Sequence, residues 1–311
     1  MPAEQSTASG TSEPPSPDDE PAGSDPNQPV TFQRYYADAG PDYATWSPNF
    51  NMHFGCFRRG MNPFHLESML EQMNREILSR LRLQSDQPAN ILDMGCGVGA
   101  TLRSLARQLP AAKLTGITLV PWQIERGTDL NNASPDAARI RFVLGDYEHA
   151  PFPSDSFDAA YALESSCYAH AANKSAFLSE AHRLLRPGGR LAVADGFLRH
   201  APPRRGLQHA IYRRLCDCWV IETLGEIHPF TLELERLGFR DIQVEQLQYR
   251  VAPSVFHVPW VTLKFLVTDV LFGSRKMTRA RWNNILAPIL LPFVSHPIGP
   301  MTYCLITATK A

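Results

Sequence analysis

The middle of the chain alternates short apolar runs with longer stretches in which apolar residues recur every three or four positions. Short apolar runs predict buried strands, and the periodic stretches predict amphipathic helices. Strands are expected at residues 90–94, 113–118, 140–144, 157–163 and 190–194. Helices are expected between them, at residues 100–108, 121–131 and 174–185. Strands that alternate with helices predict an α/β fold with a doubly wound, mainly parallel sheet.

Downstream of residue 196 the pattern is less regular. The stretch PFTLELERLGFRDIQVEQLQYRV, residues 229–251, predicts one more helix and strand, with the turn between them at LGF. Two apolar stretches follow, VPWVTLKFLVTDVLFG at residues 258–273 and NNILAPILLPFVSHPIGP at residues 283–300. Charged residues and prolines interrupt them, so both are expected to be too short and too broken to span a bilayer. They could cover an apolar ligand pocket, rest on a membrane surface or complete the core.

Composition divides the chain into four parts. Residues 1–30 are rich in Pro, Ser and Gly and carry six acidic residues without one Lys or Arg, so this tail should be disordered. Residues 31–83 are expected to form an N-terminal helical and aromatic cap, and residues 84–251 the α/β domain. Residues 252–311 form a C-terminal apolar extension that completes the domain or its pocket. A hydrophobic content of 44% over 311 residues is ample for a sizeable core.

Charge and cysteine usage exclude several kinds of partner and site. Because the tail holds six of the acidic residues, the formal net charge of −1 corresponds to +5 for the remaining residues, with basic clusters at 199–214 and 275–281. Such clusters are usually solvated faces, so no nucleic-acid partner is expected. The six cysteines contain no C-x-x-C pair and no secretory apolar segment precedes them, which favours neither a metal site nor a disulfide framework. A reducing, cytoplasmic location fits this pattern.

A glycine-rich loop follows the first expected strand. The stretch NILDMGCGVGATLRSLA, residues 90–106, spaces its glycines G-x-G-x-G. The dinucleotide fingerprint is G-x-G-x-x-G, and the Walker spacing G-x-x-x-x-G-K is absent, so the pattern disfavours dehydrogenases and P-loop NTPases. Ligands of doubly wound sheets lie at the carboxyl ends of the strands, which places a ligand on this loop. A tight turn that binds nothing is the alternative.

Four segments stand out along the expected sheet: LDMGCGVG at 92–99, GITLVPWQ at 116–123, GDYEHAPFPSDSFDAAYALES at 145–165 and LLRPGGRLAVAD at 184–195. Together they resemble the class I S-adenosylmethionine-dependent methyltransferases. In motifs they are most similar to the tocopherol, sterol and isoprenoid small-molecule methyltransferases. The resemblance is strong over roughly residues 83–195. It implies a Rossmann-like methyltransferase sheet and S-adenosyl-L-methionine as cofactor.

The resemblance also implies which residues hold the cofactor. In the family, the glycine loop lies against its methionine part, the end of the second strand holds the ribose, and the acid after the third strand meets the adenine. The corresponding residues are Asp93, Gly95, Gly97 and Gly99, then Thr118, then Asp146 with Tyr147 beside the ring. Most members have an acid where this chain has Thr118. The stretch GITLVPWQ is similar to one in which a Gln, here Gln123, reaches the ribose; an exposed helix residue is the alternative for Gln123.

The segment LESSCYAH, residues 163–170, ends the fourth expected strand. In the family this position faces the methyl group on the cofactor, and the flanking apolar run predicts that Glu164 is buried. ESSCYA is similar to the Glu-Ser segment of sterol and isoprenyl C-methyltransferases, where the acid serves as a base or steadies a carbocation. A carboxylate that only hydrogen-bonds loop amides is the alternative. His170 is a second candidate base, although a loop histidine is more often a surface residue.

Aromatic residues crowd the stretch FQRYYADAGPDYATWSPNFNMHFGCF, residues 32–57. This stretch resembles the N-terminal cap of the same family, which closes over the cofactor and helps to line the acceptor pocket. The resemblance places Tyr36 and His53 at the site, whereas several of the other rings are more consistent with core. Desolvated aromatic faces stabilise a sulfonium or another cation by about 0.5–2 kcal/mol each.

The resemblance therefore implies a methyltransferase that acts on a lipophilic small molecule. C-methylation of an isoprenoid, prenyl or sterol-like acceptor is the leading hypothesis, with Tyr36, Trp46 or Tyr168 facing a cation and Glu164 accepting a proton. O- or N-methylation of a phenol or amine stays open, with His53, Glu164 or His170 as base. A non-catalytic protein that binds the cofactor as a scaffold also stays open. Contact between the C-terminal apolar extension and a membrane surface is a further hypothesis.

Overall fold

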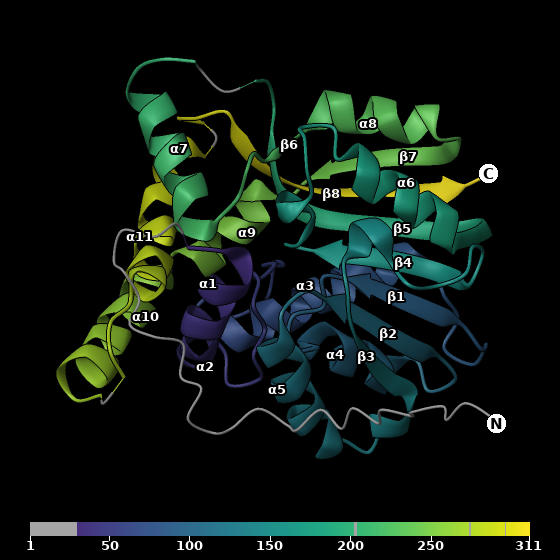
Figure 1. Ribbon diagram of the computed structural model, residues 1–311, viewed down its shortest axis with the longest axis horizontal. Helices are drawn as coiled ribbons and strands as arrows, with labels where there is room; N and C mark the ends of the chain where they lie inside the picture. The colour runs from purple at the N-terminus through teal and green to yellow at the C-terminus, as the bar shows by residue number, and fades with distance from the viewer. Residues whose placement is uncertain (1–29, 202–203, 274, 296) are drawn as a thin grey trace, which may run out of the picture.

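The computed structural model describes residues 30–201, 204–273, 275–295 and 297–311. A twisted sheet forms its centre, with the strand order β3-β2-β1-β4-β5-β8-β7 and the short β6 paired with β5 (Figure 1). Strands β1 to β5 pair in parallel, whereas β8 is antiparallel to both of its neighbours. The strands are β1 Asn90–Met94, β2 Lys113–Thr118, β3 Ile140–Leu144, β4 Phe157–Leu163, β5 Leu185–Leu198, β6 Gly225–Glu226, β7 Phe239–Gln246 and β8 Met301–Lys310. The predicted doubly wound α/β sheet is confirmed.

The first four strands begin and end where the apolar pattern placed them. The fifth is longer than expected, because β5 begins at Leu185 and ends at Leu198 rather than covering 190–194 alone. The intervening RPGG segment, residues 186–189, interrupts the pairing: Phe157 faces Leu185, whereas the next pair joins Ala159 to Arg190. The four residues therefore bulge out of a continuous strand instead of forming a separate turn.

The sequence pattern did not reveal the C-terminal strand β8. Its residues MTYCLITATK show no sustained apolar and polar alternation, because nearly the whole strand is buried on both faces, Thr302 and Thr307 included. β8 inserts between β5 and β7 and pairs Asp195 with Cys304 and Gly196 with Tyr303. A boundary at residue 251 therefore does not divide the fold, since the C-terminal extension supplies an inner strand of the sheet.

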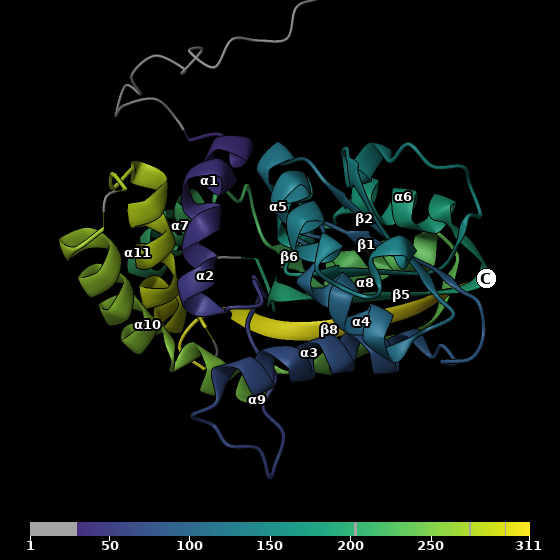
Figure 2. The ribbon, with the colours of Figure 1, turned by 90° about the horizontal axis from the view of Figure 1, so that it is seen from below.

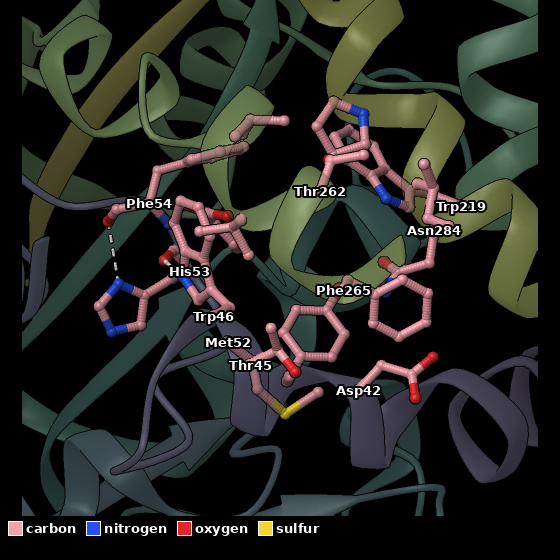
Figure 3. A pocket seen from close by; sticks show the side chains of 16 residues that line it. Asp42, Thr45, Trp46, Met52, His53, Phe54, Trp219, Thr262, Phe265 and Asn284 are labelled. Atoms are coloured by element: carbon pink, nitrogen blue, oxygen red, sulfur yellow. Dashed lines mark hydrogen bonds between the residues drawn. The ribbon is translucent and has the colours of Figure 1, made fainter. Parts of the chain in front are cut away.

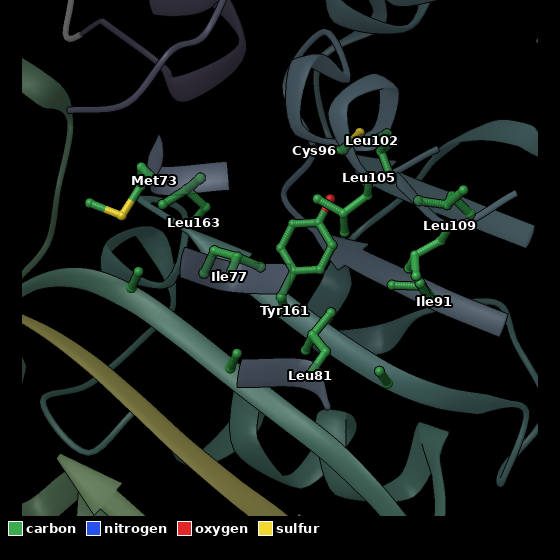
Figure 4. Packing of buried hydrophobic residues seen from close by; sticks show 14 of the residues in the cluster. Met73, Ile77, Leu81, Ile91, Cys96, Leu102, Leu105, Leu109, Tyr161 and Leu163 are labelled. Carbon is green, nitrogen blue, oxygen red and sulfur yellow. The ribbon is translucent and has the colours of Figure 1, made fainter. Parts of the chain in front are cut away.

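Helices cover both faces of the sheet. On one face, α3 Leu66–Leu81, α4 Ala100–Gln108 and α9 Gln248–Val255 pack onto a cluster of buried residues that surrounds Tyr161 of β4 (Figure 4). On the other face, α6 Ser175–Leu184 and α8 Ile227–Arg236 cover a second cluster. The remaining sheet-covering helix, α5, packs against the end of β3, where its Gly127 lies close to the ring of Phe142. The bounds of α5 are Pro121–Asn132.

A group of helices lies beyond the carboxyl ends of the strands (Figures 1 and 2). These elements are α1 Phe32–Ala39, η1 Gly40–Asp42, α2 Tyr43–Trp46, α7 Leu207–Trp219, α10 Val258–Phe265, the π-helical turn η5 Leu266–Leu271 and α11 Arg279–Val294. The buried guanidinium of Arg281 on α11 donates two hydrogen bonds, of 2.8 and 3.0 Å, to the carboxylate of Asp42, and Arg275 donates a third of 2.6 Å. Part of the basic cluster at 275–281 thus ties the C-terminal helices to the cap. Short 3₁₀ turns lie at η2 Ala137–Arg139, η3 Tyr147–His149 and η4 Ser166–Tyr168.

Two sequence expectations concern the ends of the chain. The disordered tail expected at residues 1–30 lies outside the described residues, except for Val30. The first C-terminal apolar stretch belongs to a longer helical run, Gln248–Leu271, of 24 residues; an 18-residue window within it has a mean hydropathy of 1.3, and 17% of that window is buried. By length and composition this run is long enough to cross a membrane, so the expectation that the stretch is too short was wrong.

Candidate active site

A cavity of about 260 Å³ lies where the loops after β1, β2 and β4 meet the N-terminal cap. Apart from Gly99, which immediately precedes α4, and Trp46, all the residues that the sequence singled out for the site line this first cavity. They are Tyr36, His53, Asp93, Gly95, Gly97, Thr118, Gln123, Asp146, Tyr147, Glu164, Tyr168 and His170. Residues from five separate segments of the chain therefore meet around one space.

The glycine loop between β1 and α4 forms one wall of the first cavity. Gly95 and Gly97 have φ angles of 103° and 52°, which favour glycine. A Cβ atom on Gly95 would lie 2.3 Å from the Cβ of Ser165, so packing against the loop after β4 requires a glycine there. A Cβ atom on Gly97 would contact the sulfur of Met52 at 3.4 Å and would otherwise enter the cavity. Gly97 therefore leaves the backbone bare on the cavity side.

Asp93, at the end of β1, places a buried carboxyl group on the same wall. The hydroxyl of Tyr161 donates a 2.8 Å hydrogen bond to its Oδ2 atom. Burial raises the pKa of Asp93 to about 7, and the bond from Tyr161 opposes this rise. A positively charged ligand group near this carboxyl group would favour its ionised form.

Thr118 and Gln123 lie together at the end of β2 and the start of α5. Both side chains are buried, and Thr118 donates a 2.5 Å hydrogen bond to the Oε1 atom of Gln123. Gln123 is therefore not an exposed helix residue. A hydroxyl and an amide occupy the place where most family members carry an acid, so this part of the wall is polar but uncharged.

Asp146 and Tyr147 line the cavity after β3. Asp146 begins the short turn η3 and accepts a 2.8 Å hydrogen bond from the backbone N–H of Glu148. Its side chain remains 39% exposed, which leaves it accessible to a ligand. The hydroxyl of Tyr147 donates to the backbone oxygen of Ser165 at 2.9 Å, and this bond joins the loops after β3 and β4.

Glu164 follows β4 and has a left-handed backbone conformation, with φ at 51°. Its Oε1 atom accepts hydrogen bonds from the backbone N–H of Phe54, at 2.8 Å, and from the hydroxyl of Tyr303, at 2.9 Å. Desolvation raises the pKa of Glu164 to about 8, helped by the nearby charge of Asp195, while the two hydrogen bonds act in the opposite direction. Within the described part of the chain, these bonds engage Oε1 alone. Glu164 thus binds a loop amide and also presents a carboxyl group to the cavity.

Two buried ionisable residues hold the loop that follows Glu164. The carboxylate of Asp195 accepts hydrogen bonds from the hydroxyl of Ser166, at 2.7 Å, and from the backbone N–H of Cys167, at 2.9 Å. The ammonium group of Lys174 donates to the backbone oxygens of Ala169, at 2.6 Å, and Thr223, at 2.7 Å. Burial lowers the pKa of Lys174. These contacts stabilise the strained conformation at Glu164.

Two further cavities meet the first one at Glu164. The second cavity, of about 110 Å³, lies between the cap and the C-terminal helices (Figure 3). The third cavity, of about 380 Å³, lies between the ends of β5 and β8 and helices α9 and α11. Glu164 and Met52 line all three cavities, and Phe54 and Trp219 line both the second and the third. The carboxyl group therefore stands at the junction of a polar cavity with two mainly apolar ones.

The other candidate catalytic residues have partners of their own. The ring nitrogens of His53 lie 2.9 Å from the backbone oxygen of Phe54 and 3.2 Å from Oδ1 of Asn51, and burial lowers the pKa of His53. A proton-accepting role for His53 would require one of these contacts to break. Tyr36 and Tyr168 share a hydrogen bond of 2.9 Å between their hydroxyls. They line both the first cavity and the third.

His170 lies at the rim of the first cavity. Its side chain is 75% exposed, and its Nδ1 atom lies 2.6 Å from the buried carboxylate of Glu148. The pKa of His170 is raised because Glu148 accepts a hydrogen bond from the ring and stabilises its positive charge. His170 therefore faces solvent, and unlike Glu164 it lines neither the second cavity nor the third.

Sequence reasoning missed three residues around Glu164. Tyr303 belongs to the unrecognised strand β8. Asp195 lies within β5, one residue beyond the expected end of that strand. Met52 stands among the cap aromatics without any motif of its own. Only the alignment of β8 beside β5 brings Tyr303 within reach of Glu164, so no local signal could have identified it.

Comparison with known proteins supports the family. A family model described as a methyltransferase domain matches residues 91–189, which include the glycine loop, Thr118, Gln123, Asp146 and Glu164. The chain carries a class I S-adenosylmethionine-dependent methyltransferase domain. A geranyl diphosphate methyltransferase whose structure was solved in complex with S-adenosylmethionine has the same fold, with a TM-score of 0.60 at 18% identity over 83% of this chain and 98% of that one.

Relatives extend beyond the matched domain. A probable chloroplastic tocopherol O-methyltransferase of Oryza sativa is 27% identical over 231 residues, which cover 72% of this chain and 61% of that protein. A sterol 24-C-methyltransferase of Gibberella zeae is 28% identical over 213 residues, covering 66% of this chain and 54% of that protein. The chain thus spans little more than half of the length of these relatives. A cyclopropane synthase from Mycobacterium tuberculosis has the same fold, with a TM-score of 0.75 at 19% identity over 90% of this chain and 97% of that one.

The first cavity of the methyltransferase domain fits this cofactor. Its glycine wall is open where a Cβ at Gly97 would intrude, and Asp93 offers a buried carboxyl group suited to a cationic amine or sulfonium. Thr118 and Gln123 offer polar groups to a ribose, and Asp146 offers a carboxylate to an adenine amino group. The cavity therefore has a partner for the amine or sulfonium, for the ribose and for the adenine, in the order in which the strands follow one another.

Proposed function

We propose that the protein is an S-adenosylmethionine-dependent methyltransferase that acts on a lipophilic small molecule. The observation that carries this proposal is the position of Glu164, which lines the first cavity and both apolar cavities at once. An acceptor in the second or third cavity would approach the first cavity next to this carboxyl group. When bound, S-adenosylmethionine supplies an electrophilic methyl group carried on a positively charged sulfur.

The lining of the two apolar cavities favours a neutral acceptor. Among the described residues that line them there is no Lys or Arg, and the ionisable acids are Asp42, Glu164 and Asp195. Asp42 already pairs with Arg281. A diphosphate or carboxylate in these cavities would lose its hydration without gaining a cationic partner, which is costly. An uncharged isoprenoid, prenyl or sterol-like acceptor would avoid that cost.

C-methylation of such an acceptor is the reaction that these residues support best. A carbon–carbon double bond that gains a methyl group becomes cationic and must then give up a proton. The pKa of Glu164, about 8, suits a group that accepts this proton and releases it to solvent. The rings of Tyr36, Tyr43 and Tyr168 line the third cavity beside Glu164 and would stabilise the positive charge.

O-methylation of a phenol is the second candidate, because Glu164 would accept a phenolic proton from the same place. The relatives named above include an O-methyltransferase as well as a C-methyltransferase. N-methylation of an amine would use the same base. A scaffold that binds the cofactor without turnover would not need apolar cavities that meet the first cavity at Glu164.

A direct experiment distinguishes these reactions. Purified protein is incubated with S-adenosylmethionine and, separately, with prenyl alcohols, sterols, quinols and prenyl diphosphates. Release of S-adenosylhomocysteine and a mass gain of one CH₂ unit identify the acceptor, and magnetic resonance locates the new methyl group on carbon, oxygen or nitrogen. We expect turnover with a neutral acceptor and little with the diphosphates. Preferential use of a diphosphate, or cofactor binding without turnover on the whole panel, would contradict the proposal.

A further inference from the structure

The outermost helices of the molecule expose an unusual number of large apolar side chains. Phe256, Trp260 and Leu263, which precede or belong to α10, are 80%, 67% and 53% exposed. On the turn η5 and just beyond it, Leu271 and Phe272 are 71% and 82% exposed. We call Phe256, Trp260, Leu263, Val267, Leu271 and Phe272 the apolar ridge. Contiguous exposed apolar surface of this kind marks an interaction site.

The spacing of the ridge is helical. Residues 256, 260, 263, 267 and 271 are separated by three or four positions, so they follow one side of the helical run Gln248–Leu271. The adjacent helix α11 exposes Trp282, Ile289 and Phe293, again at helical spacing. Figures 1 and 2 place α10 and α11 next to each other at the edge of the molecule opposite the C-terminus.

Positive charge surrounds this apolar surface. Lys264, Lys276 and Arg279 are all exposed. Between residues 248 and 300 the sequence contains a single acid, Asp269, and its carboxylate lies 3.6 Å from the buried guanidinium of Arg281. An anionic surface would therefore meet apolar side chains flanked by cations, with the one acid of this segment already paired.

The inner sides of the same helices line the proposed acceptor site. Val258, Val261 and Phe265 of α10, together with Ile285 and Pro288 of α11, line the second cavity (Figure 3). Phe256 itself lines the third cavity. The exposed apolar surface is thus continuous with the walls of both apolar cavities, and the helices that carry it separate these cavities from the outside.

We propose that the apolar ridge and the exposed side of α11 dock on the surface of an anionic lipid bilayer. Aromatic and aliphatic side chains on one side of a helix enter the headgroup region, while flanking Lys and Arg attract anionic lipids. Trp260 and Trp282 suit this interface, because indole rings concentrate at headgroup level. The delivery of a membrane-dissolved acceptor through these helices rests on the proposed function; the docking itself does not.

The structure favours a helix that lies on the bilayer over one that crosses it. The run Gln248–Leu271 buries Val258 and Phe265 and pairs Asp269 with Arg281 of the fold. A crossing helix would have to withdraw these side chains from the second cavity and expose Asp269 to hydrocarbon. Docking through one side leaves all these contacts intact.

The test measures binding of the full chain to vesicles of phosphatidylcholine with and without phosphatidylglycerol, by sedimentation. The ridge variant is Trp260→Glu/Leu263→Glu. The matched control is Leu232→Glu/Val244→Glu, which places the same charges on exposed apolar positions of α8 and β7, away from the ridge. We expect the ridge variant to bind anionic vesicles at least about 30-fold more weakly, as follows from losing two half-exposed apolar contacts. The control should bind like the unmodified protein.

A charge variant, Lys264→Gln/Lys276→Gln/Arg279→Gln, should lose the preference for anionic over neutral vesicles. Circular dichroism and S-adenosylhomocysteine affinity verify that each variant folds. Equal sedimentation of the ridge variant and the unmodified protein would overturn the proposal, as would no binding by either. So would a dimer, measured by light scattering without lipid, that the ridge variant dissociates, because the ridge would then cover a second copy of the chain.

Delivery is measured separately, with an acceptor identified by the panel described above. The ridge variant should lose turnover on acceptor dissolved in vesicles and keep turnover on acceptor dissolved in detergent. Equal loss in both would contradict delivery through the ridge. If the protein methylates nothing, the sedimentation result still decides whether the ridge docks on a bilayer.

Discussion

Tyr303 is the residue through which the C-terminal strand contacts Glu164, and replacing it with Phe tests the proposed role of Glu164 as a base. The hydroxyl of Tyr303 donates a 2.9 Å hydrogen bond to Oε1 of Glu164. This bond stabilises the ionised carboxylate and so opposes the rise that burial causes in the pKa of Glu164. Phe keeps the ring and removes only the hydroxyl. Tyr303→Phe should therefore raise the pKa of Glu164 further.

The size of the effect follows from the kind of bond removed. A hydrogen bond to a charged group contributes about 1.5–3 kcal/mol, which corresponds to a pKa change of about one to two. With the pKa of Glu164 near 8, about a tenth of the carboxyl groups are ionised at pH 7. After the substitution that fraction falls about 10- to 100-fold. If the ionised carboxylate accepts the proton, turnover at pH 7 should fall by the same factor.

The assay is turnover at saturating acceptor and cofactor, measured from about pH 6 to about pH 10. Turnover of the unmodified protein should rise with pH as Glu164 ionises, and the rise should move to higher pH in the Phe variant. The positive charge of bound S-adenosylmethionine would lower the pKa of Glu164 in both proteins. The quantity to compare is therefore the displacement between the two pH curves. The matched control is Tyr212→Phe, a buried tyrosine whose hydroxyl accepts from the backbone N–H of Leu224 instead.

Two outcomes would refute this reasoning. If Tyr303→Phe lowers turnover by the same factor at every pH, the hydroxyl acts on the acceptor or on packing, not on the ionisation of Glu164. A shift of the same size in Tyr212→Phe would show that the curves report overall stability.

Three further predictions concern the first cavity. Glu164→Gln should lower turnover about 10²- to 10⁴-fold while S-adenosylhomocysteine affinity, measured by calorimetry, changes little; near-normal turnover would make Glu164 structural. Gly97→Val should abolish S-adenosylhomocysteine binding, because φ is 52° and the side chain would enter the cavity beside Met52, and an unchanged affinity would remove the loop from the cofactor site. Burial raises the pKa of Asp93 to about 7, so its contribution to folding is lost as pH rises from about 4 to about 7. Without cofactor at pH 8, Asp93→Asn should therefore have a higher melting temperature than the unmodified protein and an unfolding free energy larger by up to about 4 kcal/mol. Equal melting temperatures at pH 8 would contradict the prediction that ionised Asp93 destabilises the fold.

The local pattern of the sequence determined the strands β1 to β4 and the helices between them. β1, β2 and β4 lie inside the sheet and β3 lies at its edge, yet each of the four is a short, mainly apolar segment bounded by polar or turn residues, and each helix carries its own amphipathic period. The loop motifs likewise identified residues that line the first cavity, because each motif follows directly on its own strand and parallel strands end at one edge. Information of this kind is contained within a dozen neighbouring residues.

Only the tertiary structure decided what surrounds Glu164. Its partner Tyr303 lies 139 residues away, on a strand whose sequence does not alternate because both of its faces are buried. The two apolar cavities arise where the cap and the C-terminal helices pack together, and neither segment alone encloses a space. The side chains of the apolar ridge are exposed because the opposite side of α10 faces the second cavity. Apolar content in a sequence does not distinguish a side chain that faces the core from one that faces outward, since the same composition serves both until packing selects the side that is covered.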